Sequence, residues 1–236
     1  MTACRKHELL SELSIKEDFE SELIGTVLWP SSYLLVSLLE DDSESIQGKR
    51  VIELGCGCGI GGIAASKLGA SDVVCTDASE HALAMAKKNI QINCHEGERI
   101  STKTYIWGDE ESTLGLNPPF DYVIGSDILY NEFGADKLPK ALAMLVGKLA
   151  AAKKEILSEY KWTVLLVNQR RNPSVEERFM EQIEALFSGC IIEKKILTKE
   201  DEMKLLGKEE SKLQVNENEF EDYLKGSVFH VLRIRN

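Results

Sequence analysis

The sequence lacks any long apolar run, and this absence excludes a membrane-spanning helix. Among its 236 residues, no apolar stretch approaches the roughly 20 residues that are needed to cross a bilayer. The chain also does not open with the charged and then apolar segment that is typical of a signal peptide. We therefore expect a cytoplasmic protein, with the nucleus as a second location and no membrane partner.

Basic residues are too few for a typical nucleic-acid-binding protein. The chain has 28 lysines and arginines against 39 aspartates and glutamates, which gives a formal net charge of -11. A phosphate backbone requires a basic protein face, which this composition does not supply. We therefore expect no nucleic-acid partner.

The pattern of cysteines also lacks the features of a zinc site or a disulfide framework. There is no C-x-x-C pair and no histidine pattern near the six cysteines, which are Cys4, Cys56, Cys58, Cys75, Cys94 and Cys190. Cys56 and Cys58 lie close together, but they are inside a glycine-rich turn where small side chains simply fit. We expect reduced thiols and no metal.

That glycine-rich turn is the most informative stretch of the chain. It joins a predicted buried strand, Arg50 to Leu54, to a predicted helix, Ile60 to Leu68. Gly55, Gly57 and Gly59 have no Cβ atom, so the chain can bend sharply and a ligand can approach the backbone. The arrangement predicts a nucleotide-binding turn.

Asp77 strengthens this prediction. It ends the next predicted strand, Asp72 to Asp77, about 20 residues beyond the glycines, which is the offset of a carboxylate that binds ribose hydroxyls. The spacing fits a dinucleotide and S-adenosylmethionine (AdoMet) equally, because both present a ribose there. Glu53 favours AdoMet, since a carboxylate at the end of the first strand would repel a pyrophosphate. The run from Glu53 to Gly59 also resembles the first motif of class I AdoMet-dependent methyltransferases, and this resemblance implies that the carboxylate faces the cationic methionine end of the cofactor.

The rest of the pattern predicts one α/β domain, because a chain of this length forms a single sizeable core. Further strands are predicted at Ile100–Trp107, Asp121–Ser126, Trp162–Asn168, Ile191–Leu197 and Ser227–Arg235. Further helices are predicted from Pro30, after Ser79, from Asp136 or Pro139 to Leu149, and over Glu176–Phe187. We expect a Rossmann-like, seven-stranded, mostly parallel sheet with an antiparallel last strand and helices on both faces.

Three parts of the chain are distinguished. Residues 1–24 form an N-terminal extension that either makes a short amphipathic helix or stays mobile, and residues 25–236 form the domain. Within it, residues 199–225 are a charged insertion between the last two strands, which is either a solvated face or an acidic rim for a basic partner. We expect a monomer.

Two tryptophans and one proline pair have alternative interpretations. Trp29 either anchors the first helix to the core or contributes to the site, and Trp107 either stacks on a purine or packs in the core. Asn117 to Phe120 resembles the Asn-Pro-Pro-aromatic signature of methyltransferases that modify adenine or glutamine amides. It precedes the fourth strand instead of following it, so we interpret it as a turn.

The segment Ser126 to Tyr130 leaves the fourth strand at its carboxyl end, level with the glycine turn. With four earlier features it forms an ordered set that resembles the seven-β-strand protein lysine methyltransferases related to the methyltransferase-like 21 group. The resemblance extends over nearly the whole chain, from about Gly25 to Arg235. The set consists of Leu28-Trp29-Pro30, the turn from Glu53 to Gly59, Asp77, Trp107 and Ser126-Asp-Ile-Leu-Tyr130.

The resemblance implies methyl transfer from AdoMet to a lysine of a protein substrate. The residues implied to line AdoMet are Trp29, Gly55, Cys56, Gly57, Asp77, Trp107 and Ser126, and those implied to face the substrate are Asp127 and Tyr130. A free lysine, with a pKa of about 10.4, must lose a proton before transfer. Burial and the sulfonium charge favour the neutral amine, whereas ionised Asp127 favours the ammonium. We therefore assign Asp127 to capture and orientation, and Tyr130 to a hydrogen bond or a ring contact.

Several alternatives remain open at this point. Asp127 could instead cap the following helix, with Tyr130 packed against it. Related enzymes act on histidine or arginine, and a small-metabolite methyltransferase would need a lid, which is not obvious after the fifth strand. A non-catalytic adaptor would retain the fold without the activity, and a dehydrogenase would need a nicotinamide site.

Overall fold

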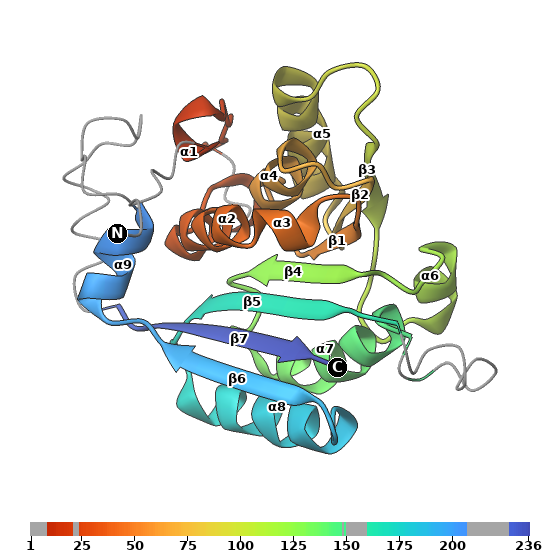
Figure 1. The fold of residues 1–236 in the computed structure, drawn as a ribbon, viewed down its shortest axis with the longest axis vertical. Helices are drawn as coiled ribbons and strands as arrows, with labels where there is room; N and C mark the ends of the chain where they lie inside the picture. The colour runs from red at the N-terminus through yellow and green to blue at the C-terminus, as the bar shows by residue number, and fades with distance from the viewer. Residues whose placement is uncertain (1–8, 21–23, 148, 150–159, 207–226) are drawn as a thin grey trace.

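The computed structural model describes residues 9–20, 24–147, 149, 160–206 and 227–236 (Figure 1). In these residues one seven-stranded sheet has the order β3-β2-β1-β4-β5-β7-β6. The neighbours pair in parallel, except that β7 runs antiparallel to both β5 and β6. The predicted fold, a mostly parallel sheet with an antiparallel last strand, is confirmed.

The strands lie close to their predicted positions. They are β1 (Arg50–Leu54), β2 (Asp72–Asp77), β3 (Ile100–Thr104), β4 (Tyr122–Ser126), β5 (Thr163–Gln169), β6 (Ile191–Ile196) and β7 (Phe229–Arg235). The largest difference concerns β3, which ends three residues before its predicted end. Trp107 therefore lies in the loop that follows this strand, and not at the end of the strand.

Helices connect the strands. The predicted ones differ mainly where they begin, and the one expected to end at Leu149 ends at Leu145; the helices Ser43–Ile46, Glu110–Gly115 and Lys199–Leu206 were not predicted. They are α1 (Leu9–Glu12), α2 (Pro30–Asp41), α3 (Ser43–Ile46), α4 (Ile60–Lys67), α5 (Glu80–Asn93), α6 (Glu110–Gly115), α7 (Glu132–Leu145), α8 (Pro173–Leu186) and α9 (Lys199–Leu206), with a 3-10 turn at Ile24–Thr26. Helix α7 begins earlier than predicted because the Asn131 side chain accepts the backbone N–H of Gly134 at 2.9 Å, and so caps its first turn. Ser79 caps α5, as predicted.

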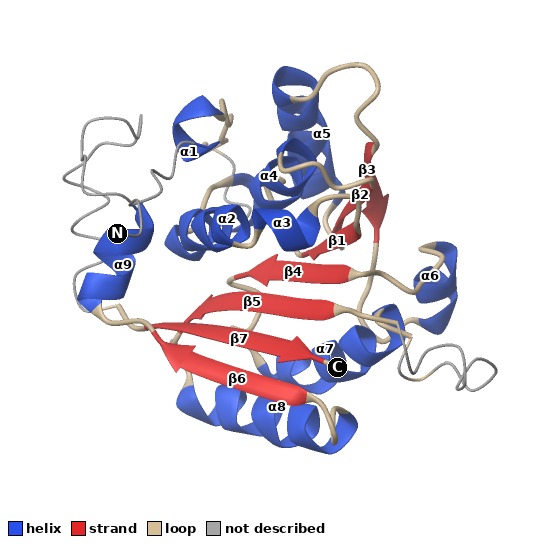
Figure 2. Ribbon diagram, viewed as in Figure 1, coloured by secondary structure: helices blue, strands red, loops and turns tan. Residues whose placement is uncertain are grey.

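The helices cover both faces of the sheet (Figures 1 and 2). On one face, buried residues of α2 and α4 pack with Val51, and on the other face residues of α7 and α8 pack with Ile52 and Leu54. This alternation follows from the two-residue period of a strand. It buries β1 on both sides and leaves its carboxyl end beside the glycine turn.

The N-terminal segment packs against α5. Two buried asparagines of α5 bind its backbone: Asn93 accepts the N–H of Ser14 at 2.8 Å, and Asn89 accepts the N–H of Lys16 at 2.8 Å. Both side chains also donate back to the carbonyl oxygens of the same two residues. Residues 9–20, which were expected to belong to a separate extension, are thus joined to the domain, whereas residues 1–8 and 21–23 lie outside the described part.

Of the predicted charged insertion, residues 199–206 form α9, and residues 207–225 lie outside the described residues. No helix in the described part of the chain combines the length and the apolar character that a bilayer span requires.

Candidate active site

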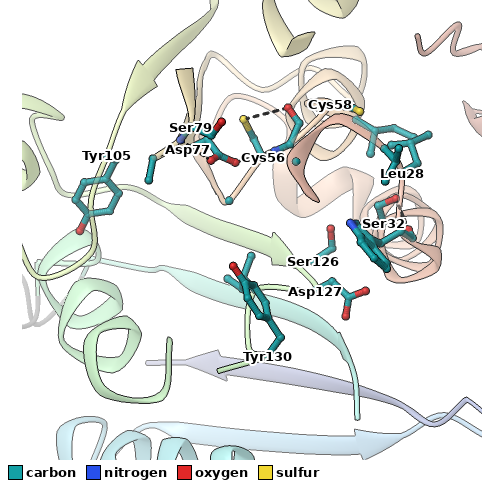
Figure 3. Close-up of a pocket in the computed structure, with 18 of the residues that line it drawn as sticks. Leu28, Ser32, Cys56, Cys58, Asp77, Ser79, Tyr105, Ser126, Asp127 and Tyr130 are labelled. Carbon is teal, nitrogen blue, oxygen red and sulfur yellow. Dashed lines mark hydrogen bonds between the residues drawn. The ribbon is translucent and has the colours of Figure 1, made fainter. Parts of the chain in front are cut away.

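A cavity of about 580 Å³ opens where the parallel strands end (Figure 3). Figure 3 shows Cys56 and Asp77 on one side of it, and Ser126, Asp127 and Tyr130 on the opposite side. Every predicted site residue except Glu53 lines the cavity; these are Trp29, Gly55, Cys56, Gly57, Asp77, Trp107, Ser126, Asp127 and Tyr130. The structure therefore brings together residues that are up to about a hundred positions apart in the chain.

The glycine turn has a backbone conformation that only glycine adopts readily. Gly55, Gly57 and Gly59 have φ angles of 56°, 51° and 81°, in the left-handed region. A Cβ atom on Gly55 would also lie 2.6 Å from the Ile128 side chain, and one on Gly57 would lie 3.2 Å from the carbonyl oxygen of Gly25. The turn is therefore packed against two other walls of the cavity, with its backbone facing the ligand space.

Asp77 is held in place by the residues around it. Its Oδ2 accepts the backbone N–H of Gly57 at 3.1 Å, and its Oδ1 accepts that of Ser79 at 2.9 Å. A carboxylate oxygen has two lone pairs, so each oxygen retains one for a ligand hydroxyl. The side chain thus fits the ribose-binding position that was predicted for it.

Glu53 corrects one expectation, because it does not line the cavity. Its buried carboxylate accepts the backbone N–H groups of Gly61 at 3.1 Å and Gly62 at 2.8 Å. These groups lie in the first turn of α4, where an N–H has no partner within the helix and the helix dipole favours an anion. Burial raises the pKa of Glu53 to about 7, although the two hydrogen bonds oppose this shift.

Both tryptophans line the cavity and also make packing contacts. The Trp107 ring stacks on Phe133 with 6.3 Å between ring centroids, and it packs against the core beneath. Trp29 immediately precedes α2, and its ring lies under the guanidinium of Arg171 at 5.0 Å. The two interpretations of each tryptophan, site and packing, are therefore not exclusive.

Asp127 has an unusual backbone conformation and two protein partners. Its φ angle is 53°, in the left-handed region that few non-glycine residues adopt. Its Oδ1 accepts the backbone N–H of Gln169 at 3.0 Å, and its Oδ2 accepts Nη2 of Arg171 at 2.9 Å. Because Asn131 caps α7, the alternative that Asp127 caps this helix is wrong.

Asn168 and Arg171 support this segment, and sequence reasoning did not single them out. The side-chain oxygen of Asn168 accepts the backbone N–H groups of Ile128 at 3.0 Å and Leu129 at 3.1 Å, and so fixes the loop that carries Asp127. One signal was available: Asn168 is a polar residue at the carboxyl end of an otherwise apolar strand. Nothing in the local sequence distinguished Arg171 from Arg170.

The Asn-Pro-Pro-Phe segment lies between α6 and β4 and does not line the cavity. Arg50 Nη1 donates to the carbonyl oxygens of Asn117 at 3.2 Å and Pro119 at 2.8 Å, while Phe120 is fully buried. The interpretation of this segment as a turn is confirmed.

The cysteines near the turn are buried thiols. Burial raises the pKa of Cys56, Cys58 and Cys75 above the ordinary thiol value. Within the described residues, no group of three or more His, Cys, Asp or Glu side chains is arranged to hold a metal ion.

The strand order and the glycine turn beside Asp77 define a Rossmann-like fold with a nucleotide-binding turn, and the family match that follows identifies the ligand as AdoMet. The chain belongs to the lysine methyltransferase family, since the model of that family matches residues 8–186. The residues present fit AdoMet, because the backbone of the glycine turn faces the cavity and Asp77 has lone pairs for a ribose.

Known relatives agree with this assignment. The chain is 32% identical to protein N-lysine methyltransferase METTL21A of Danio rerio over 180 residues, which is 75% of this chain and 74% of that protein. It is 36% identical to EEF1A lysine methyltransferase 3 of Mus musculus over 122 residues, 51% of each protein. It is also 31% identical to calmodulin-lysine N-methyltransferase of Arabidopsis thaliana over 74% of this chain and 55% of that one. The last two alignments thus span about half of the relatives' length.

Solved structures share the fold. Magnesium protoporphyrin IX methyltransferase from Synechocystis PCC 6803, crystallised with bound SAH, has a TM-score of 0.53 at 16% identity, covering 87% of this chain and 82% of that one. An O-methyltransferase from Bacillus cereus in complex with SAH has a TM-score of 0.55 at 17% identity, covering 91% and 84%. At such identities the likeness concerns the fold alone.

Proposed function

We propose that this chain transfers a methyl group from AdoMet to the side-chain amine of a lysine in a protein substrate, which enters beside Asp127 and Tyr130. The observation that carries this proposal is the position of Asp127, a buried carboxylate on the opposite side of the cavity from Asp77 (Figure 3). Asp77 suits the ribose of the cofactor, and Asp127 suits a cationic or amine acceptor. We therefore assign the Asp77 side of the cavity to the cofactor, as its cofactor end, and the Asp127 side to the lysine acceptor, as its acceptor end.

At the cofactor end, residues of this chain would bind and orient AdoMet. AdoMet supplies a methyl group that the sulfonium charge has already activated. Asp77 accepts ribose hydroxyls with the lone pairs that Gly57 and Ser79 leave available. The ring of Trp107 provides an aromatic face for the adenine, and Ser126 and Cys56 complete the wall.

At the acceptor end, Asp127 and Tyr130 orient the amine. A lysine with an ordinary pKa of about 10.4 arrives as the ammonium and must become neutral before it attacks. Asp127 accepts a hydrogen bond from the incoming lysine and so orients it, and the Tyr130 hydroxyl accepts or donates a second hydrogen bond while the proton passes to solvent water at the open mouth of the cavity. The rest of the rate enhancement comes from alignment of the amine with the methyl group.

The mouth of the cavity favours a protein substrate over a small one. Three apolar or aromatic side chains that line it are about half exposed: Ile106 at 51%, Tyr130 at 48% and Phe133 at 50%. Only residues 170–172 separate β5 from α8, so this connection offers no lid to enclose a metabolite. An open apolar rim suits a side chain that a folded partner presents.

We also propose that the protein is a monomer of the cytoplasm and the nucleus, with neither nucleic acid nor membrane as partner. The formal net charge of -11 supports the absence of nucleic-acid and membrane partners, because it disfavours both phosphate backbones and anionic lipid surfaces.

Transfer of labelled methyl from AdoMet into whole-cell protein extract tests the proposal. The control variant is Asp127→Asn and not Asp127→Ala, because asparagine tolerates the left-handed backbone at this position. We expect the wild-type protein to label a lysine, identified by mass spectrometry. Asp127→Asn should reduce labelling by about 100-fold or more, with AdoMet binding still measurable by calorimetry.

Other outcomes would replace the proposal with a specific alternative. Label on histidine or arginine would change the acceptor, and AdoMet binding without any protein label would indicate a small-molecule substrate. Absence of AdoMet binding would indicate an adaptor. Protection against heat by NAD, and not by AdoMet, would indicate a dehydrogenase.

A further inference from the structure

Arg171 connects three segments at the acceptor end of the cavity. It lies in the short connection between β5 and α8, and its Nη2 is 2.9 Å from Oδ2 of Asp127, in the loop after β4. Its Cζ also lies 5.0 Å from the ring centroid of Trp29, at the start of α2. A carboxylate and an indole face are the groups that recognise a cation. Arg171 thus occupies a cation site made by two residues of the cavity wall.

We propose that Arg171 neutralises Asp127 and thereby keeps the methyl-transfer end of the cavity free of net negative charge, so that the acceptor lysine is held as the neutral amine. The proposal rests on the function proposed above. It makes Arg171 a positioning residue that acts on the acceptor through Asp127.

The burial of the Asp127 side of this ion pair makes its charge balance important. The Asp127 side chain is only 6% exposed, so bulk water and salt screen it weakly. A lone carboxylate in such a place would stabilise the ammonium form of a bound lysine, which cannot accept a methyl group. With the guanidinium attached, the carboxylate still accepts hydrogen bonds through its remaining lone pairs, but its attraction for a second cation is largely cancelled.

Among the described residues, two other carboxylates of neighbouring elements, Asp77 and Glu176, do not pair with Arg171. Asp77 lies at the opposite side of the cavity. Glu176 of α8 binds Arg170 at 3.4 Å and Lys194 at 2.8 Å, and it also contacts His230 of β7. Among the described residues, Arg171 is the only cationic side chain within 4.0 Å of the Asp127 carboxylate. Without the positive charge of Arg171, the negative charge of Asp127 would therefore act at full strength on a ligand bound in the cavity.

A substrate-free experiment compares two ligands that differ in charge at the reacting atom. AdoMet has a cationic sulfonium, and its product S-adenosylhomocysteine (AdoHcy) has a neutral thioether. Calorimetry with both ligands gives the ratio of their affinities for the wild-type protein and for Arg171→Gln. We expect Arg171→Gln to shift the ratio about tenfold in favour of AdoMet, because the uncompensated carboxylate attracts the sulfonium.

Two further variants serve as a matched control and as a test of the opposite effect on the affinity ratio. Arg170→Gln removes the neighbouring charge, which pairs with Glu176 instead of Asp127, and it should leave the ratio unchanged. Asp127→Asn should shift the ratio in the opposite direction, and the double variant should return it to the wild-type value. An unchanged ratio in Arg171→Gln would overturn the proposal, whereas failure of every variant to bind AdoMet would overturn the proposed function itself.

A pH profile supplies the second readout. With whole-cell extract as acceptor, methyl transfer by Arg171→Gln should require a pH about one unit higher than the wild type to reach its plateau. Arg171→Lys keeps the charge and should restore the wild-type profile. A loss of activity by the same factor at every pH would mean that Arg171 has only a structural role, and would also overturn the proposal.

Discussion

The side-chain amide of Asn89 donates a hydrogen bond to the carbonyl oxygen of Cys58 at 3.0 Å, so helix α5 holds the glycine turn directly. The same amide group donates to the carbonyl oxygen of Lys16 at 3.0 Å. One fully buried residue thus joins the N-terminal segment to the turn that is expected to bind AdoMet. Gly25, Val27 and Leu28, further along that segment, line the cavity.

Asn89→Ala should weaken AdoMet binding as well as the fold. It leaves three backbone groups without their partner, which we expect to cost about 3 kcal/mol of unfolding free energy. Asn93→Ala is the matched control, because Asn93 binds Ser14 in the same way but does not contact the turn. Chemical unfolding and calorimetry of both variants test this. A fall in AdoMet affinity of equal size in the two variants would show that the Cys58 contact has no separate role.

Glu53 should make the apoprotein less stable as the pH rises from 4.5 to 7. Its pKa is raised from 4.5 to about 7 by burial, so the folded protein binds more protons than the unfolded chain in this range. The stability that is present below pH 4.5 is then lost progressively, by about 3 kcal/mol in total. Other carboxyl groups act in the opposite direction; the pKa of Glu98, for example, is lowered to about 2, with hydrogen bonds from His95, Lys67 and Ser66 outweighing burial.

Glu53→Gln isolates this contribution, since glutamine has the shape of the protonated side chain and does not titrate. Urea unfolding at several pH values gives the difference in free energy of unfolding between the variant and the wild type. This difference should move in favour of the variant by about 3 kcal/mol between pH 4.5 and 8. A difference that is constant with pH would contradict the raised pKa.

Gly62→Ala should be strongly destabilising although it lies in a helix, where alanine is normally preferred. A Cβ atom there would lie 2.3 Å from Sγ of Cys75 and 3.1 Å from Oε2 of Glu53, so the packing beneath α4 must shift. We expect a loss of about 2 kcal/mol in a thermal or urea unfolding experiment. Adding Cys75→Ala should recover part of it. Gly115→Ala, at an open position in α6, should be close to neutral, and an equal loss there would refute the packing argument.

Asn168→Leu should slow methyl transfer without a comparable effect on AdoMet binding. The substitution removes the oxygen that fixes the backbone of Ile128 and Leu129, next to Asp127. A displacement of about 1 Å at the acceptor end is enough for a rate loss of about 100-fold. Asn168→Asp keeps the acceptor oxygen and should retain more activity. Single-turnover rates and calorimetry test this, and a wild-type rate in Asn168→Leu would reject the role.

Local patterns determined much of the fold and the cofactor end of the site. The boundaries of β1 and β2 follow from short apolar runs next to glycine, and the turn follows from three glycines that all have positive φ angles. Asp77 was predictable because a fixed spacing links it to that turn. The ends of elements were predicted less well. Strand β3 ends at Thr104, before Trp107, and α7 begins at Glu132, ahead of the two predicted starts at Asp136 and Pro139.

The amino-acid sequence by itself determined where the strands lie along the chain, the glycine turn and the segment from Ser126 to Tyr130, because each depends on residues close together in the chain. Only the tertiary structure decided which partners their polar groups have. It directed Glu53 to the first turn of α4, and it brought Arg171 to Asp127 across 44 positions. Partners of this kind are chosen by burial and by the need to satisfy polar groups in three dimensions, which no local spacing encodes.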